Sequence, residues 1–263
     1  MNPLQPIGRA VLALLAEIGR VSLFLKDAVV QGLTPTYYVR QIFEQMWRIG
    51  YNSLPVVGLT SFFTGGALAL QIYQGSTPGT ASTLVPNIVA LGITRELGPV
   101  LAGLMVSGRV GASIAAELGT MRVTEQIDAL ESLAVDSFKY LVVTRVLACV
   151  IALPLLTVLM NFAGMVGGFF AETIISQMSF SFYFKSAFST LSFSDYIPPT
   201  LKTMAFGFVI GCTSSYLGYQ ATGGAEGVGR ASTQSVVLSS VFLIVLNVVL
   251  VKFIFFLYPG SAT

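Results

Sequence analysis

The stretch LVPNIVALGITRELGPVLAGLMVSGRVGASIAAELG, residues 84–119, decides the fold of this chain. Its first half is apolar enough to cross a lipid bilayer, yet Arg95 and Glu96 stand side by side within it. An ionisable pair inside a membrane segment is unfavourable unless it is paired or faces a water-filled cavity. We therefore interpret this pair as a functional site, with a structural ion pair that fixes helix packing as the alternative.

The sequence becomes strongly charged directly after this stretch. Residues 120–133 read TMRVTEQIDALESL, and Thr124 is placed to cap a helix over 125–133. The spacing of Ile127 and Leu130 puts both on one face of that helix, with acidic residues beside them. The pattern predicts a short amphipathic helix in a water-facing loop.

The composition is that of a membrane protein. Of the 263 residues, 54% are hydrophobic and only 10% are charged, and the mean hydropathy is +0.79. Soluble domains carry about 25% charged residues, so this chain is expected to be an integral membrane protein. Its net charge of +2 gives no case for binding nucleic acid.

Several kinds of active site lack their usual side chains here. The chain has no histidine, the commonest metal ligand and a frequent general base. Cys149 and Cys212 each lie alone in an apolar stretch, which is typical of packing residues and not of a disulfide or a metal site. No G-x-x-x-x-G-K-[ST] loop occurs, so this chain lacks a phosphate-cradling loop, and we expect no cofactor in it.

Long apolar stretches predict an all-α protein with about five transmembrane helices, since about 20 apolar residues cross the hydrocarbon core. The spans are expected at 54–73, from residue 84 through the charged pair, and at 146–171, 203–219 and 231–251. The polar segment 172–202 is expected to form short helices. No linker occurs, so residues 1–263 are one domain, with the transmembrane bundle at 51–258.

Proline and glycine mark local features of these spans. Pro99 removes a backbone donor three residues after Glu96 and should kink or interrupt that helix. Small residues four apart allow two helices to approach closely. Such pairs are Gly164 with Gly168 and Gly207 with Gly211.

Residues 1–50 are expected to form amphipathic helices at the membrane interface. The first would carry a narrow polar stripe on a broad apolar surface, which suits the interface, and a short extra span is the alternative. That stripe consists of Arg9, Glu17, Arg20 and Asp27. In the second helix, 37–49, the charged residues are spaced four apart so that neighbours can pair. They are Arg40, Glu44 and Arg48, and the interfacial aromatics Tyr37, Tyr38 and Trp47 accompany them.

Lysine and arginine are distributed unevenly between the two sides of the expected bundle. Ten lie on the side of the N-terminus and the loop after residue 108, and three lie on the other side. Basic loops tend to remain in the cytoplasm. The N-terminus is therefore expected in the cytoplasm, and five spans then place the C-terminus in the periplasm.

Three motifs carry a resemblance to a known family. RELGPV (Arg95 to Val100), GRVGASIAAELGTMRVTEQIDAL (Gly108 to Leu130) and LPLLTV (Leu153 to Val158) are similar to the MlaE-type permeases. These are the membrane subunits of ABC systems that move lipids between bacterial membranes. The similarity runs from about Tyr51 to the C-terminus.

This resemblance implies a set of partners. A second copy of the chain would complete a homodimer in the bacterial inner membrane. Two cytoplasmic ABC ATPase subunits would bind ATP, and a ring of MCE domains would sit on the periplasmic side. The helix at 125–133 would dock into the ATPase, with simple packing beneath its own bundle as the alternative.

The resemblance also implies site residues. Leu68, Tyr73, Arg95, Glu96 and Leu97 would face a phospholipid. Leu68 and Tyr73 offer contact to acyl chains, and Arg95 would pair with a phosphate or with Glu96. The residues expected to couple to the ATPase are Glu117, Arg122, Glu125, Asp128, Leu130 and Glu131.

Phospholipid transport is thus the expected function, and transport of sterol or another hydrophobic solute is the alternative. Two hypotheses come from other classes. One is a membrane-embedded enzyme that modifies lipids with Glu96 as acid or base. The other is a structural scaffold for the periplasmic ring.

Overall fold

The computed structural model describes residues 4–35, 37–77 and 80–257, without the side chains of 4–15, 17, 18 and 257. Helices make up every regular element in these ranges, which confirms the all-α class. The α-helices are α1 (Leu4–Leu33), α2 (Val39–Gly75), α3 (Ala81–Gly92), α4 (Gly98–Val106), α5 (Ala112–Val123), α6 (Gln126–Ser132), α7 (Thr144–Ser176), α8 (Phe180–Thr190), α9 (Phe193–Tyr219) and α10 (Gly224–Leu257). Three π-helical turns join them: η1 (Ile93–Leu97), η2 (Ser107–Gly111) and η3 (Phe138–Val143).

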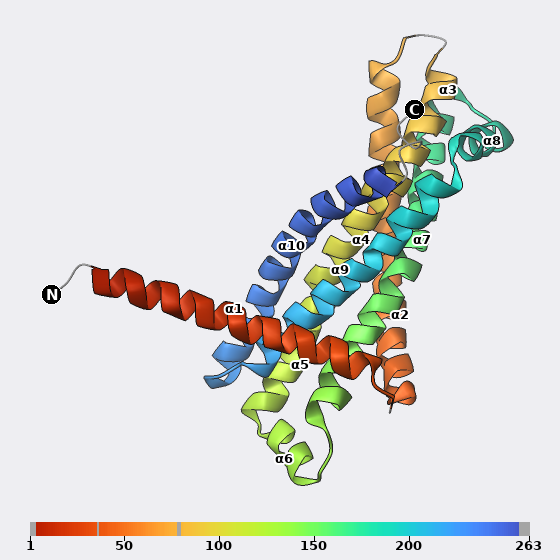
Figure 1. Cartoon of the computed structure of the whole chain (residues 1–263). Coiled ribbons are helices and arrows are strands. Elements are labelled where there is room, and N and C mark those ends of the chain that lie inside the picture. Colours follow the sequence, from red (N-terminus) through yellow and green to blue (C-terminus); the bar gives the residue numbers. More distant parts are fainter. Residues whose placement is uncertain (1–3, 36, 78–79, 258–263) are drawn as a thin grey trace.

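Four segments in the described ranges are long and apolar enough to cross a membrane. They are Val39–Gly75, Ala81–Val123, Phe138–Ser176 and Gly224–Phe256. The fifth expected span, 203–219, belongs to α9, which falls short of this apolarity because it carries Asp195, Lys202 and two prolines. It nevertheless runs within the bundle beside α7 and α10 (Figure 1), where its neighbours shelter those polar groups.

The long α2 merges two segments that the sequence analysis separates. The interfacial helix expected at 37–49 continues without a break into the first span, although Pro55 lies inside it. Proline is tolerated in membrane helices where neighbouring groups satisfy the freed backbone. The charged start of α2 is therefore rigidly connected to its apolar part.

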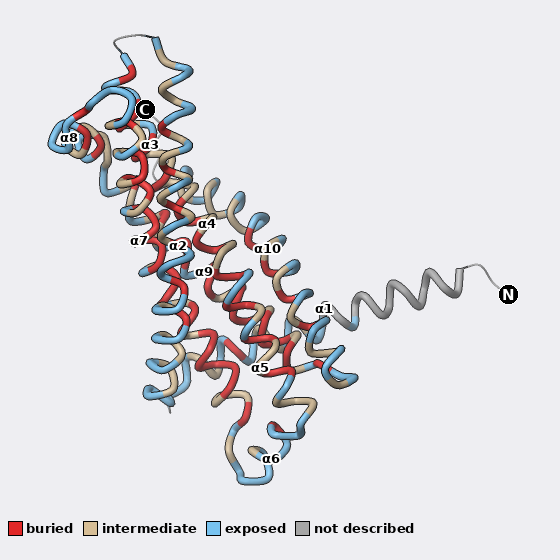
Figure 2. The backbone as a smooth tube through the Cα atoms, turned by 180° about the vertical axis from the view of Figure 1, so that it is seen from behind, coloured by how far each residue is buried: buried red, intermediate tan, exposed pale blue. Residues whose placement is uncertain are grey.

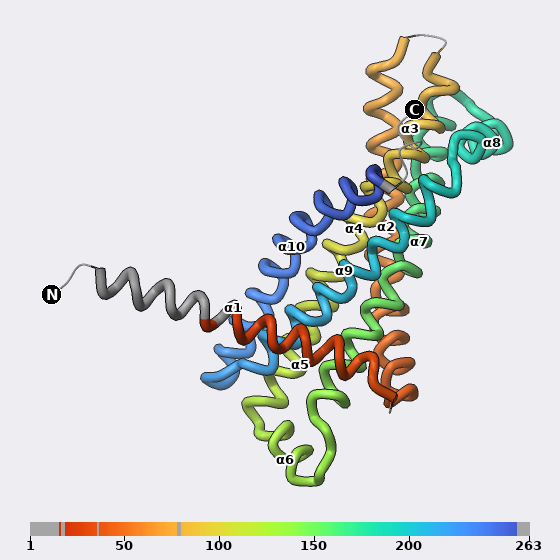
Figure 3. The backbone as a smooth tube through the Cα atoms, in the orientation of Figure 1, coloured from red at the N-terminus to blue at the C-terminus, as the bar shows by residue number. Residues whose placement is uncertain are grey.

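The central rod from α3 to α5 is one path of helix with two π-turns in it (Figure 3). The first turn, η1, ends two residues before Pro99 and contains Arg95 and Glu96. The Gly98 N–H donates to the Ile93 carbonyl, five residues back, as expected for a π-turn. The interruption predicted from Pro99 is thus confirmed, and it takes the form of a wider turn.

Glycines allow the close packing of α7 against α2 and α9. A side-chain carbon at Gly167 would collide with the Phe62 carbonyl of α2. On the other side of α7, a carbon at Gly211 of α9 would lie 2.9 Å from the Val146 Cα. The close approach predicted for Gly207 and Gly211 is confirmed, and a carbon at Gly164 would likewise meet Ser61 of α2, whereas a carbon at Gly168 would meet Tyr183 and Val89.

Burial is concentrated in the middle of the bundle (Figure 2). In the most apolar 18-residue stretch of Phe138–Ser176, 67% of the residues are buried. In the corresponding stretch of Gly224–Phe256, only 11% are buried. The helix α10 therefore presents apolar side chains outward, to lipid or to another protein.

The first helix lies across the bundle instead of along it (Figure 1). Its Phe24 ring packs edge-on against Phe138 and Tyr216, with centroids 5.0 and 5.3 Å away. This crossing agrees with an interfacial helix better than with an extra span. The side chains of Arg9 and Glu17, from the predicted stripe, lie outside the described residues.

Candidate functional site

Two ion pairs join η1 to α9 inside the bundle. The Arg95 Nε lies 2.9 Å from an Asp195 carboxylate oxygen, and the Lys202 Nζ lies 3.0 and 3.1 Å from the two Glu96 oxygens. The expected pairing of Arg95 with Glu96 is therefore wrong. Adjacent helical residues point about 100° apart, so each side chain reaches a different partner on α9.

Hydrogen bonds from Ser192 hold the Asp195 side chain in place independently of Arg95. It closes a capping box at the start of α9, since one oxygen accepts from the Ser192 backbone N–H at 3.0 Å and from its hydroxyl at 2.7 Å. The other oxygen accepts from Arg95.

Lys202 is the most deeply buried member of the network. Its side chain is 2% exposed, whereas that of Glu96 is 43% exposed. Besides Glu96, its ammonium group donates to the Arg95 main-chain oxygen at 3.1 Å. In a regular α-helix that oxygen would accept from residue 99, and Pro99 has no N–H to give.

A third helix completes the network. The Asn247 amide of α10 donates to a Glu96 oxygen at 3.1 Å. Arg95 keeps 31% of its side chain exposed while it pairs with Asp195. The arrangement fixes a partly exposed guanidinium and a partly exposed carboxylate on an otherwise apolar bundle.

The apolar residues expected at the site lie at different distances along α2. The Leu68 side chain is next to Gly92, one turn before Glu96, since a carbon at Gly92 would lie 3.4 Å from its Cδ2. Leu68 and Tyr73 both pack on the apolar cluster of α3 that ends at Ile93. Leu97 is partly buried within η1. Of the two α2 residues, Leu68 lies closer to the charged pair, and Tyr73 lies further along α2.

Three members of this network escaped the sequence analysis. Asp195 and Lys202 were assigned to a polar surface segment, and Asn247 to an unmarked span. Asp195 and Lys202 are seven residues apart, which puts them on one helix face. The negative charge of Asp195 and the positive charge of Lys202 complement the charges of Arg95 and Glu96. This complementarity was the signal in the sequence that could have predicted the two ion pairs.

The expected coupling helix is present as α6, at the opposite end of the bundle from α3 and α8 (Figure 1). Ile127 is fully buried in the main core and Leu130 packs against it. Glu131 accepts from Ser137 at 2.7 Å and from Tyr219 at 3.3 Å, while Arg122 binds Asp128 at 2.7 Å. The outward face keeps Glu125, Asp128 and Leu133 exposed.

The predicted cap of this helix is wrong. The Thr124 hydroxyl donates back to the Thr120 carbonyl at 2.8 Å, so it belongs to the end of α5. Glu125 occupies the cap position with a left-handed backbone, φ 59°. The chain reverses direction there, and the helix begins at Gln126.

Glu117 stands apart from the other expected coupling residues. Its carboxylate binds Arg48 of α2 at 2.8 Å and Arg145 of α7 at 3.3 Å. It therefore ties three helices together. Arg40 and Glu44 form their predicted pair at 3.2 Å, whereas Arg48 turns to Glu117 instead of Glu44.

Within the described ranges no three acidic, cysteine or histidine side chains are grouped to hold a metal ion. Residues 42–253 match the family described as "Permease MlaE". The chain belongs to the MlaE permease family. This places the Arg95 network and α6 in a multi-pass membrane permease.

Relatives of this permease cover nearly its whole length. It is 44% identical to a "Probable ABC transporter permease protein" of Rickettsia bellii over 97% of this chain and 98% of the relative. It is 35% identical to the chloroplast protein TRIGALACTOSYLDIACYLGLYCEROL 1 of Arabidopsis thaliana, over 89% of this chain and 67% of that protein. It is 28% identical to the "Intermembrane phospholipid transport system permease protein MlaE" of Haemophilus influenzae, over 97% and 98%.

Proposed function

We propose that this permease is the membrane subunit of an ABC transporter that moves phospholipid between the inner and outer membranes of a bacterium. The observation that carries the proposal is the Arg95–Asp195 and Glu96–Lys202 network. Charged groups at membrane depth are rare and mark substrate paths. The phospholipid transport named for the Haemophilus influenzae relative agrees with it.

Arg95 is the residue that binds the lipid phosphate. A guanidinium binds phosphate oxygens through two parallel hydrogen bonds, and 31% of this side chain stays exposed while it pairs with Asp195. Glu96 has a different task, because Lys202 and Asn247 already use its oxygens. It fixes η1 against α9 and α10, and Leu68 supplies apolar contact beside it.

The energy comes from a partner at the α6 end. A separate ATPase dimer binds ATP and docks on the exposed face of α6, which carries Glu125, Asp128 and Leu133. That end lies in the cytoplasm, and an MCE-domain ring binds the α3 and α8 end in the periplasm. A second copy of the permease completes the transporter.

Two other functions agree less well with the geometry. Sterol has no phosphate for Arg95 to bind. An enzyme that used Glu96 as a general base would need this carboxylate to face its substrate, and three of its about four lone-pair sites already accept hydrogen bonds from Lys202 and Asn247. A passive scaffold has no need of a charged network at membrane depth.

The test uses the purified complex with its ATPase. Arg95→Ala should remove most of the co-purifying phospholipid seen by native mass spectrometry, and ATP-driven lipid transfer between vesicles should fall at least tenfold. Leu97→Ala, a neighbour that makes no ion pair, is the matched control and should keep most transfer. Glu96→Gln should lose less transfer than Glu96→Ala.

Unchanged lipid occupancy and transfer after Arg95→Ala would refute the headgroup assignment. Recovery of sterol in place of phospholipid would select the alternative cargo. Transfer that needs no ATP would remove the transporter proposal itself.

A further inference from the structure

A small polar cavity lies between α2 and the η2–α5 segment, at the α6 end of the bundle. Its volume is about 110 Å³, which is room for a few water molecules or for one tetrahedral oxyanion. Arg109, in its wall, follows Arg95 by 14 residues of nearly continuous helix, or about 20 Å. The cavity is therefore separate from the Arg95 network.

The cavity wall is rich in hydrogen-bond donors. Guanidinium, amide and hydroxyl groups line it together with a single carboxylate. The polar residues are Gln45, Arg48, Asn52, Ser53, Arg109, Ser113 and Glu117. Such a wall suits a ligand that offers only acceptors, as the oxygens of a phosphodiester do.

Positive charge exceeds negative charge around this cavity. Glu117 is shared between Arg48 and Arg145, so one carboxylate faces two guanidinium groups. Arg109 adds a third, and among the residues that the structure describes no carboxylate pairs with it. Of these groups, Arg48, Arg109 and Glu117 line the cavity, so its wall carries two cations against one anion, and this excess favours an anionic ligand.

Ser53 gives an independent indication of a missing partner. Its side chain lines the cavity, the residue is only 2% exposed, and its hydroxyl has no hydrogen-bond partner in the described structure. Buried hydroxyl groups are nearly always hydrogen-bonded, because leaving one unpaired costs free energy. A ligand oxygen in the cavity would satisfy it.

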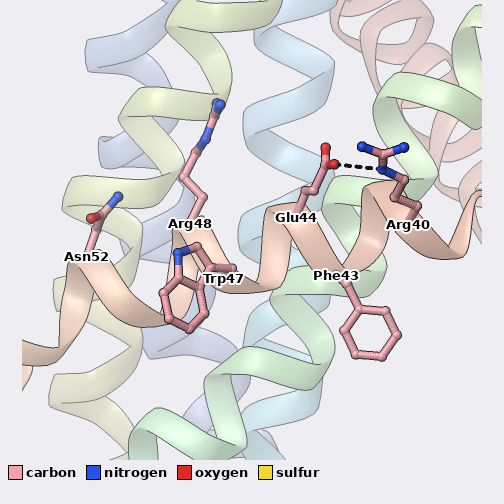
Figure 4. Close-up of a pocket in the computed structure, with 6 residues that line it drawn as sticks. All are labelled: Arg40, Phe43, Glu44, Trp47, Arg48 and Asn52. Carbon is pink, nitrogen blue, oxygen red and sulfur yellow. Dashed lines mark hydrogen bonds and ion pairs between the residues drawn. The ribbon is translucent and has the colours of Figure 1, made fainter.

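An open groove of about 870 Å³ continues from the cavity, because Arg48 and Asn52 line both (Figure 4). In Figure 4, Arg48 extends from one side of α2, and the rings of Phe43 and Trp47 extend from the other. The Trp47 residue is 69% exposed, and its ring stacks on Tyr51 with centroids 5.0 Å apart. Exposed aromatic rings beside basic residues are typical of the headgroup level of a bilayer.

We propose that this cavity binds the phosphodiester of an anionic glycerophospholipid from the leaflet at the α6 end. Arg109 and Arg48 hold the phosphate, Ser53 donates to it, and the acyl chains leave along the aromatic side of α2. The site is a second lipid site. It rests on the membrane location of this end and not on the proposed transport function.

The test measures lipid binding by the purified full-length permease, without its ATPase. Dioctanoyl phosphatidylglycerol is titrated, and dioctanoyl phosphatidylcholine and inorganic phosphate are titrated in parallel. Arg109→Gln should weaken phosphatidylglycerol binding at least tenfold, and Ser53→Ala should weaken it two- to fivefold. Lys26→Gln removes one exposed positive charge from α1 and should leave the affinity within twofold.

Each contrary result has a distinct meaning. Unchanged phosphatidylglycerol affinity in Arg109→Gln overturns the site, as does equal affinity for phosphatidylcholine. Tighter binding of inorganic phosphate than of lipid assigns the cavity to a free anion instead. Loss of self-association in Arg109→Gln with unchanged lipid binding makes the surface an interface between copies. Arg95→Ala should leave the Arg109-dependent binding intact, so this site and the transport proposal fail separately.

Discussion

The Nζ atom of Lys202 lies 3.1 Å from the main-chain oxygen of Arg95. Because Pro99 cannot supply an N–H to that oxygen, a side chain from another helix supplies the hydrogen bond. The same ammonium group binds the Glu96 carboxylate. The backbone defect in the central rod and the buried ion pair therefore stabilise each other, and loss of one should weaken the other.

Replacement of Lys202 tests this dependence. Lys202→Met should lower stability by about 1–3 kcal/mol, below the usual cost of breaking a buried pair because Glu96 is partly exposed. Thermal unfolding can be followed with a thiol-reactive dye, since Cys149 and Cys212 are buried. The double change with Glu96→Gln should cost less than the sum of the single changes. Additive losses would show that the two groups are independent.

The crossing of α2 and α7 should tolerate no added carbon at its centre. Gly167→Ala places a Cβ against the Phe62 carbonyl, and backbone cannot yield as a side chain can. We expect a loss of at least about 2 kcal/mol, typical of overpacking. Gly58→Ala, also in a helix but with open space at its Cβ, should stabilise by up to about 1 kcal/mol. Equal effects in a melting experiment would refute the role of close approach.

The exposed acids of α6 should govern association with the ATPase. Reversing Glu125 and Asp128 to lysine should weaken co-purification of the ATPase at least tenfold and leave the melting temperature of the permease nearly unchanged. Glu226→Lys, 86% exposed at its side chain, is the control for each single reversal, because it changes the charge by the same two units. The permease alone should hydrolyse no ATP. Equal ATPase recovery from all variants would remove the coupling role.

The orientation in the membrane can be read by cysteine labelling. Ser132, at the end of α6, should be labelled only from the cytoplasm when changed to cysteine, and Ser181, in α8, only from the periplasm. The two native cysteines are buried and give little background. Labelling of both positions from the same side would refute the proposed orientation.

Much of this architecture follows from short-range signals in the sequence. Apolar runs predicted four of the spans, and Pro99 predicted the interruption at η1. The spacing of Gly207 and Gly211 predicted the close crossing of α9 and α7. These signals act over one or two helical turns, so spacing alone reveals them.

Long-range partners were harder to predict from the sequence. Arg95 and Asp195 are 100 residues apart, and which side chains meet depends on how the helices rotate against each other. The π-turns change that rotation, and no pattern of residues in the sequence predicts where they occur. The same reason explains why Arg48 was expected on Glu44 and is found on Glu117.

The two π-turns also determine in which direction the side chains beyond them point around the axis of the central rod. Each holds one residue more than an α-turn, so everything beyond it is rotated by about 100° relative to an uninterrupted helix. Removal of one residue from η1 would keep the composition of the rod almost unchanged, yet it would swing Arg109 and Glu117 away from α2. A single deletion in η1 would therefore rotate the α5 end of the rod against the α3 end and break its contacts to α2, although almost every side chain would be kept.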